Sequence, residues 1–163
     1  MSTTTRGASR AAPRMILALV LALLACAAVS GTAAAGTRGH VAGAYAWNGA
    51  EPGTTCEPIS DVIVRCVTPN FVLNYTGDLV GTSTAEFAQT INCATGRTVG
   101  HGTETFVGSV NGTAGVTLKW RIVFASDFDC LGFYPFNFRG LGIVSQWGGL
   151  LKFDDTTYDG WLR

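Results

Sequence analysis

Two glutamates have the type and spacing that acid–base catalysis requires. Glu86 and Glu104 lie on either side of a turn expected at residues 94–97. Antiparallel pairing around this turn brings together residues whose numbers sum to about 190, so Glu86 is predicted to face Glu104. Facing carboxylates repel each other, and in an apolar interior one can hold a proton while the other accepts one. We expect these two residues to be catalytic if the protein is an enzyme. The alternative is that both glutamates lie on the solvent face, which Thr82 and Thr84 share with Glu86.

A second group of residues can contact a ligand. His101 lies between two glycines and alternates in phase with Val99 and Val107, so it either lines an interior as a proton carrier or lies on the surface. Aromatic side chains at strand spacing usually form a core, and a small barrel is either filled by them or holds one small ligand. The candidate ligand-binding residues are Tyr75, His101, Phe106 and Trp120. The other aromatic residues expected in the interior are Tyr45, Trp47, Phe71, Phe87, Phe124, Phe153 and Trp161.

The elements that must position these residues are short strands separated by turns. The cleanest alternation runs from Val116 to Phe124, where apolar and polar residues exchange at every step. Pro69-Asn70 is expected to separate two strands, and residues 126–135 are expected to form a long loop that carries exposed aromatic residues. The eight predicted strands are 41–47, 61–68, 71–75, 82–92, 98–107, 116–124, 136–144 and 149–153. Eight short strands and no helical period predict an all-β sandwich or barrel.

Four cysteines of the domain indicate disulfides. Cys56, Cys66, Cys93 and Cys130 are an even number in a chain expected to be exported, and they allow three pairings. We favour Cys56–Cys66, which closes a short loop, together with Cys93–Cys130, which ties a hairpin tip to the loop around residue 130. Zinc is the alternative, but neither CxxC nor HxxxH spacing occurs, so we expect no metal and no cofactor.

The N-terminal segment has the three parts of a secretory signal. Three arginines precede the apolar run Met15–Val29, and small residues at 33–35 offer a cleavage site. The run is shorter than the roughly 20 residues of a transmembrane helix, although an uncleaved anchor is one alternative. Another is a lipoprotein signal with the lipid attached at Cys26. We expect residues 1–35 to be a signal peptide and 36–163 a single domain that is secreted, with a membrane-anchored lipoprotein as the alternative.

The charge of the predicted domain excludes one class of partner. The signal segment contains three of the eleven basic residues, which leaves eight against eleven acidic ones. Nucleic-acid binding requires clustered lysine and arginine, so we expect no nucleic-acid partner, and no membrane contact unless Cys26 is lipidated.

Two segments resemble a known family. Tyr75-Thr-Gly-Asp-Leu-Val-Gly-Thr-Ser-Thr-Ala-Glu86-Phe and Glu104-Thr-Phe-Val-Gly108-Ser-Val-Asn-Gly112-Thr-Ala-Gly115 resemble the DUF3224 family. This is a bacterial set of uncharacterised proteins among the allene oxide cyclase-like barrels, to which the dirigent proteins are related. The chain departs from the family at Thr105 and Thr113, where arginines are expected, and in its four cysteines. The resemblance implies a single eight-stranded antiparallel barrel with an apolar lumen, and association into homo-oligomers through outer strand faces. It implies no reaction.

These observations lead to one expected function and two alternatives. We expect a secreted barrel that binds a small apolar or aromatic molecule in its lumen. The first alternative is a cyclase- or dirigent-like enzyme of the isomerase type, with Glu86 or Glu104 handling protons. The second is a cell-surface interaction protein with a filled barrel that uses residues 126–135.

Overall fold

The described residues form one closed antiparallel β-barrel. The computed structural model describes residues 38–50, 52–130, 134–146 and 148–163; the predicted signal segment and Cys26 lie outside them. No helix occurs among the residues described, and in particular none that is long and apolar enough to cross a membrane. The strands are β1 (Gly39–Trp47), β2 (Thr55–Pro58), β3 (Ile63–Gly77), β4 (Leu79–Asn92), β5 (Arg97–Val110), β6 (Thr113–Asp129), β7 (Tyr134–Val144), β8 (Gly149–Asp154) and β9 (Thr157–Leu162).

Eight of these strands close the barrel, which confirms the predicted fold. Consecutive strands from β3 to β9 pair as neighbours, β9 pairs with β1, and β1 pairs back onto β3; β2 adds to the free edge of β3. Two strands were not predicted, β2 and β9. The barrel nevertheless has eight strands, because 61–68 and 71–75 form the single strand β3, which offsets the unpredicted β9, and β2 lies outside the barrel.

The joint between the two segments of β3, at Pro69-Asn70, changes which residues of the strand face the interior. Instead of ending a strand, Pro69-Asn70 forms an irregularity between Thr68 and Phe71, where Asn70 has a φ of 54°. Asparagine tolerates this left-handed conformation better than most residues, and an extra residue shifts the side-chain alternation by one. Because of this shift both Thr68 and Phe71 face the interior, and Leu73 and Tyr75 follow in phase.

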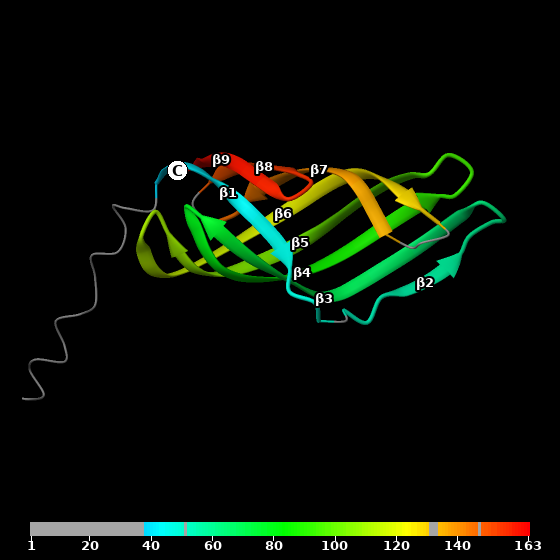
Figure 1. Cartoon of the computed structure of the whole chain (residues 1–163), viewed down its shortest axis with the longest axis horizontal. Helices are drawn as coiled ribbons and strands as arrows, with labels where there is room; N and C mark the ends of the chain where they lie inside the picture. Colours follow the sequence, from blue (N-terminus) through cyan, green and yellow to red (C-terminus); the bar gives the residue numbers. More distant parts are fainter. Residues whose placement is uncertain (1–37, 51, 131–133, 147) are drawn as a thin grey trace, which may run out of the picture. The chain divides into compact units, whose positions relative to one another are not determined.

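The barrel has a closed half and an extended half. In the closed half β1, β8 and β9 complete the barrel. However, β1 pairs with β3 only from Leu73 to Gly77, and β8 pairs with β7 only from Arg139 to Ile143. Beyond these limits β3 to β7 continue without them, with β2 on the edge, and form the extended half. Figure 1 shows β1, β8 and β9 over the left-hand part, while β2 and the far ends of β3 to β7 reach to the right.

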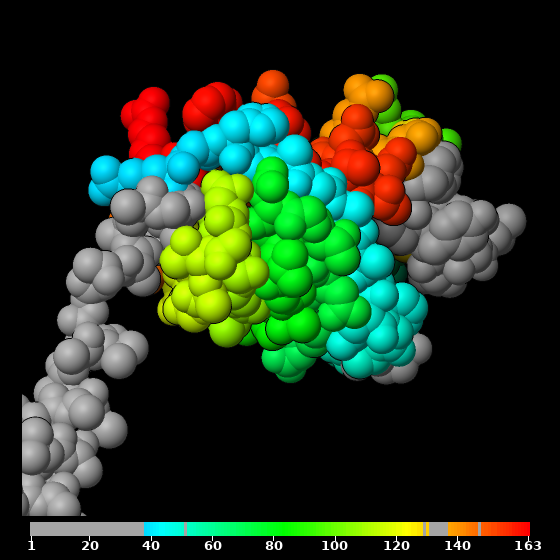
Figure 2. Space-filling view, turned by 60° about the vertical axis from the view of Figure 1, so that its left-hand side comes forward, coloured from blue at the N-terminus to red at the C-terminus, as the bar shows by residue number. Residues whose placement is uncertain are grey.

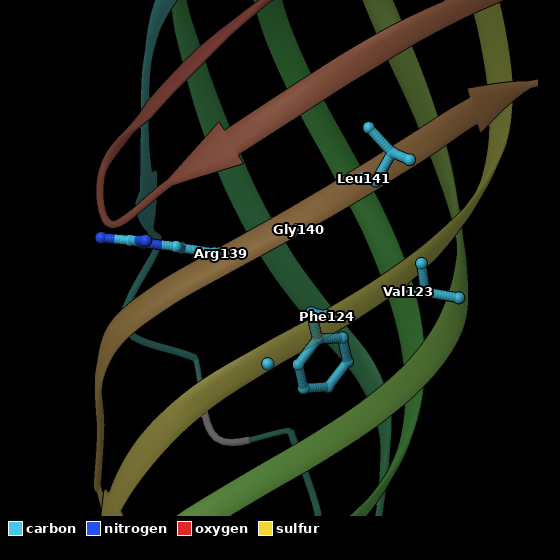
Figure 3. Close-up of a pocket in the computed structure, with 6 residues that line it drawn as sticks. Val123, Phe124, Arg139, Gly140 and Leu141 are labelled. Carbon is cyan, nitrogen blue, oxygen red and sulfur yellow. The ribbon is translucent and has the colours of Figure 1, made fainter.

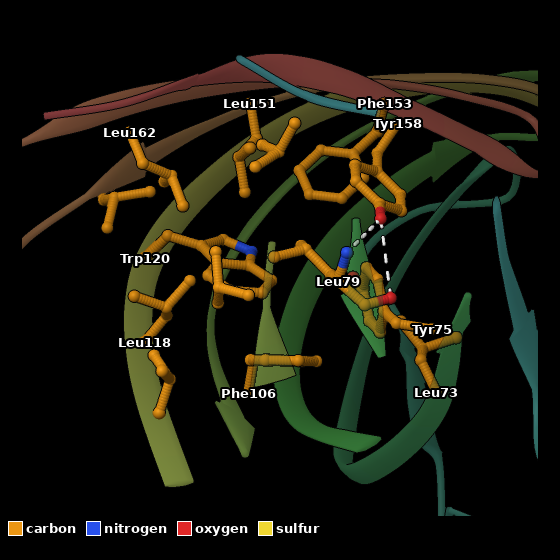
Figure 4. Packing of buried hydrophobic residues seen from close by; sticks show 14 of the residues in the cluster. Leu73, Tyr75, Leu79, Phe106, Leu118, Trp120, Leu151, Phe153, Tyr158 and Leu162 are labelled. Carbon is orange, nitrogen blue, oxygen red and sulfur yellow. Dashed lines mark hydrogen bonds between the residues drawn. The ribbon is translucent and has the colours of Figure 1, made fainter. Parts of the chain in front are cut away.

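The closed half is packed with side chains. Trp120, Tyr75 and Phe106 are the largest side chains that are almost completely buried. Figure 4 shows Leu118 beside Trp120, and Leu151 and Phe153 of β8 on the wall above them. The hydroxyl of Tyr158 accepts a hydrogen bond from the Leu79 amide at 2.7 Å. At the outer end the β3–β4 and β5–β6 turns lie side by side (Figure 2), joined by a 2.8 Å bond from the Asn111 amide to the Asp78 carbonyl. An eight-stranded barrel is just wide enough to be filled in this way.

The two predicted disulfides are confirmed. Cys56 and Cys66 are direct partners across β2 and β3, and Cys93 in the β4–β5 turn bonds to Cys130 just after β6. The second bond does not tie down a long loop, because β6 continues to Asp129. Phe128, predicted to be an exposed loop residue, is instead 7 % exposed and packs with Cys66 and Ile91 in a second small core.

Candidate functional site

Glu104 is the centre of a buried hydrogen-bond cluster in the closed half. It lies on β5 with 2 % of its surface exposed. The Tyr75 hydroxyl donates to Oε1 at 2.6 Å, the Ser83 hydroxyl donates to the same oxygen, and the Trp120 indole N–H donates to Oε2 at 3.1 Å. Three donors from three different strands therefore converge on one carboxylate. A buried carboxylate needs such partners because removing it from water unpaired is very costly.

Burial is the main cause of the raised pKa values in this cluster. Desolvation raises the pKa of Glu104, although the hydrogen bonds from Ser83, Tyr75 and Trp120 oppose the shift. Burial, followed by the charge of Glu104, also raises the pKa of Tyr75 and of its neighbour Tyr45. Tyr45 stacks on Tyr75 with ring centroids 5.8 Å apart, and its buried hydroxyl has no hydrogen-bond partner. Glu104 can thus stay protonated at a higher pH than an exposed glutamate does. Both of its carboxyl oxygens, however, already take part in hydrogen bonds with the protein.

The predicted Glu86–Glu104 pair does not form. The turn between β4 and β5 uses residues 93–96 and pairs Asn92 with Arg97, so Glu86 faces Thr103 and Glu104 faces Ala85. This register differs by one residue from the predicted one, and a shift of one residue moves a side chain to the other face of a strand. Glu86 is exposed on the outside of the barrel, whereas Glu104 is inside it.

The four predicted ligand-binding residues also separate. His101 is exposed on the outer face, because its neighbours Gly100 and Gly102 are the inward positions of β5. Tyr75, Phe106 and Trp120 lie together inside, at 2 %, 0 % and 1 % exposure, with their rings in mutual contact. These three rings are already enclosed by protein atoms in this structure.

A different set of rings, all but Phe124 partly or largely accessible, lies at the boundary between the two halves. We call it the aromatic arc; each member contacts the next, with ring centroids 5.2–6.2 Å apart. It begins at the last residue of β1 and ends at the last residue of β7 before the pairing with β8. Phe71, Phe87 and Phe138 are only partly buried although they face inward. The arc consists of Trp47, Phe71, Phe87, Phe124 and Phe138.

Two glycines of β5 make room for the middle of the arc. A Cβ atom at Gly100 would lie 2.3 Å from the Phe124 ring, and one at Gly102 would lie 2.5 Å from the Phe87 ring. Rings and β5 backbone are therefore in direct contact, and Phe87 and Phe124 meet edge to face across the strand. The sequence alone predicted Phe71, Phe87 and Phe124 as interior residues. It missed Phe138, whose signal is the alternation with Gly140 and Gly142 in β7.

The outer face of the barrel carries exposed apolar residues. A shallow hollow of about 370 Å³ lies over β6 and β7, lined by Val123, Phe124, Ala125, Arg139, Gly140 and Leu141 (Figure 3). Beside it, Ile143, Leu150 and Trp161 lie in one row across three strands, and Trp161 is 60 % exposed. Trp161 was predicted to be an interior residue; the alternation of β9 places Tyr158 and Leu162 inside instead.

Neither clusters of side chains nor comparisons with other proteins identify a function directly. The described residues contain no group of three or more His, Cys, Asp or Glu side chains that could hold a metal ion. No family model, curated protein or solved structure matches the chain. The resemblance to the DUF3224 family therefore stays a prediction, and the function has to be argued from the geometry.

Proposed function

We propose that this protein is an exported, disulfide-bonded barrel that binds a small apolar or aromatic molecule against the aromatic arc. The observation that supports this is the partial burial of Phe71, Phe87 and Phe138, which face the interior yet keep part of their surface exposed. Inward-facing apolar surface left in contact with water favours a ligand that covers it, at about 25 cal/mol per Å². Sites for small molecules are usually concave and lined by aromatic side chains.

The position of the arc also fits this role. It lies where β1 and β8 end, so a ligand can approach from the extended half without disturbing the packed closed half. The residues deeper in the barrel, Tyr75, Phe106 and Trp120, then form the rigid support of the site rather than its contact surface. A rigid support restricts the loss of conformational entropy on binding.

The geometry favours binding over catalysis. Glu86 lies on the outer face, and each oxygen of Glu104 already accepts at least one hydrogen bond inside the packed half. Among the described side chains of the arc none is titratable in the range of general acid–base catalysis. The proposal therefore assigns Glu104 to holding the interior together and includes no reaction.

Two measurements test the proposal. Native mass spectrometry of the protein purified from culture supernatant should show a bound hydrophobic compound that is released on unfolding. Equilibrium dialysis with naphthalene should then show saturable binding, weakened roughly three- to tenfold by Phe71→Leu because one aromatic contact is lost. Trp161→Leu, on the outer face, is the matched control and should bind as the unchanged protein does. Equal affinities for the two variants, or no saturable binding, would contradict the proposal.

A second candidate function is favoured by the exposed row Ile143, Leu150 and Trp161. We propose that this row lies between two copies of the chain, since contiguous exposed apolar surface commonly marks an interface. Light scattering should give the mass of an oligomer for the unchanged protein and of a monomer for Leu150→Ser combined with Trp161→Ser. A monomer in both cases would exclude this candidate and leave the aromatic arc unaffected.

A further inference from the structure

Two hydroxyl groups near the aromatic arc lack any hydrogen-bond partner. Thr98 on β5 and Ser126 on β6 face each other directly, and both point into the barrel. They are 1 % and 6 % exposed, yet neither Oγ1 of Thr98 nor Oγ of Ser126 is bonded to protein. We call them the hydroxyl pair. In the part of the chain that the structure describes, the only other buried polar side-chain atom without a partner is the Tyr45 hydroxyl.

Such a pair is unusual in a folded protein. The large majority of buried side-chain polar atoms are hydrogen-bonded, because leaving one unpaired forfeits the bonds it made to water. Serine and threonine hydroxyls can both donate and accept, so these two side chains have the chemistry to bind a third group jointly. Facing residues of an antiparallel pair have Cβ atoms only about 5 Å apart, which lets one ligand atom reach both.

The hydroxyl pair lies one inward step beyond the arc. On β6 it follows Phe124 by two residues, and on β5 it precedes Gly100 by two, so the separation along the strands is about 7 Å. On its other side Phe128 follows Ser126 by two residues on β6, while Ile91 of the same small core faces Thr98 directly from β4. The two hydroxyls are therefore surrounded by apolar side chains, on the side of the arc that faces the extended half.

We propose that the hydroxyl pair binds the polar end of the ligand whose apolar body lies on the aromatic arc. This inference rests on the proposed function and makes it more specific. It assigns the ligand to neutral amphipathic molecules that carry a hydroxyl or carbonyl group at one end of an apolar or aromatic body.

The absence of charge around the pair indicates a neutral ligand. Arg97 and Arg139 are exposed on the outer face, and Asp127, next to Ser126, accepts a hydrogen bond from the Asn137 side chain. Within the described ranges, Glu104 is the one charged side chain buried in the interior, and it lies deeper, in the closed half. A carboxylate ligand would lose its hydration here without meeting a cation, which is strongly unfavourable.

The test compares three probes of the same shape. Equilibrium dialysis of the full domain with naphthalene, 2-naphthol and 2-naphthoate should rank 2-naphthol as the tightest and 2-naphthoate as the weakest. Thr98→Val and Ser126→Ala should each weaken 2-naphthol roughly fivefold, the contribution of one hydrogen bond, and leave naphthalene unchanged. Thr103→Val, an exposed residue of the same strand, is the matched control. Without ligand, Thr98→Val should raise the Tm by a few degrees, because an unpaired buried hydroxyl becomes a methyl group of similar shape.

The outcomes separate the two proposals. If naphthalene and 2-naphthol bind equally and neither variant changes their ratio, the hydroxyl pair is not a binding group, although the aromatic arc is. If both variants lower the Tm and leave the ratio unchanged, the pair holds an ordered water only, and the inference is wrong. If none of the three probes binds, both the proposed function and this inference are wrong.

Discussion

The role of the buried cluster around Glu104 can be tested by a substitution for which the same chain offers a matched control. Glu104→Leu removes the acceptor of three hydrogen bonds, while Glu86→Leu changes the same residue type on the next strand and the opposite face. In the first variant the Trp120 indole N–H loses its only acceptor, and Tyr75 and Ser83 can at best bond to each other. Each buried donor left unpaired costs about 1–3 kcal/mol.

The expected magnitude follows from this count. Two unpaired donors cost about 2–6 kcal/mol, partly offset because no carboxyl has to be buried, so we expect Glu104→Leu to lose about 3 kcal/mol of unfolding free energy. Glu86→Leu should change it by less than about 0.5 kcal/mol, as exposed substitutions usually do. Urea denaturation followed by tryptophan fluorescence measures both. Equal stabilities of the two variants would refute the assignment of Glu104 as the centre of the cluster.

The pH dependence tests the same cluster independently. Because burial raises the pKa of Glu104 above its ordinary value of 4.5, the folded protein keeps this proton where the unfolded chain has lost it. The contribution of Glu104 to the free energy of unfolding is therefore fully present below pH 4.5 and is lost as the pH rises through the pKa of Glu104 in the folded protein. The stability difference between the unchanged protein and Glu104→Leu should be largest at acidic pH and shrink as the pH rises. A difference that grows with pH would show that the pKa of Glu104 is lowered instead.

Three further predictions concern stability. Replacing Cys93 and Cys130 by serine should lower the unfolding free energy by about 4 kcal/mol, because the bond closes a loop across 37 residues; a midpoint in urea that does not change would contradict this. Tyr158→Phe should cost about 1–3 kcal/mol, since the buried Leu79 amide loses its acceptor, and an unchanged thermal midpoint would exclude that role. Gly102→Ala should cost about 1–3 kcal/mol, because its Cβ would lie 2.2 Å from a backbone oxygen of the neighbouring strand; wild-type stability would show that β5 can move outward.

Local sequence patterns predicted much of the fold. Strict alternation from Val116 to Phe124 places every second residue inside β6, because side chains in a strand point to opposite faces in turn. The disulfide pairing followed from the separation of the cysteines, since Cys56 and Cys66 are close enough in sequence to close a hairpin. Strand β9 was missed, because a glycine at the inward position 160 and an apolar residue at the outward position Trp161 interrupt its alternation.

What the sequence by itself determined is the class of the fold, its disulfides and the inward face of its most regular strand, which depend on neighbours along the chain. The tertiary structure alone decided which face Glu104 takes, because that depends on a single residue in the β4–β5 turn. It also decided that Phe71 joins the interior through the irregularity at Asn70, and that Thr98 and Ser126 face each other without partners. These features arise from strand register and closure, which bring together residues that no local pattern relates.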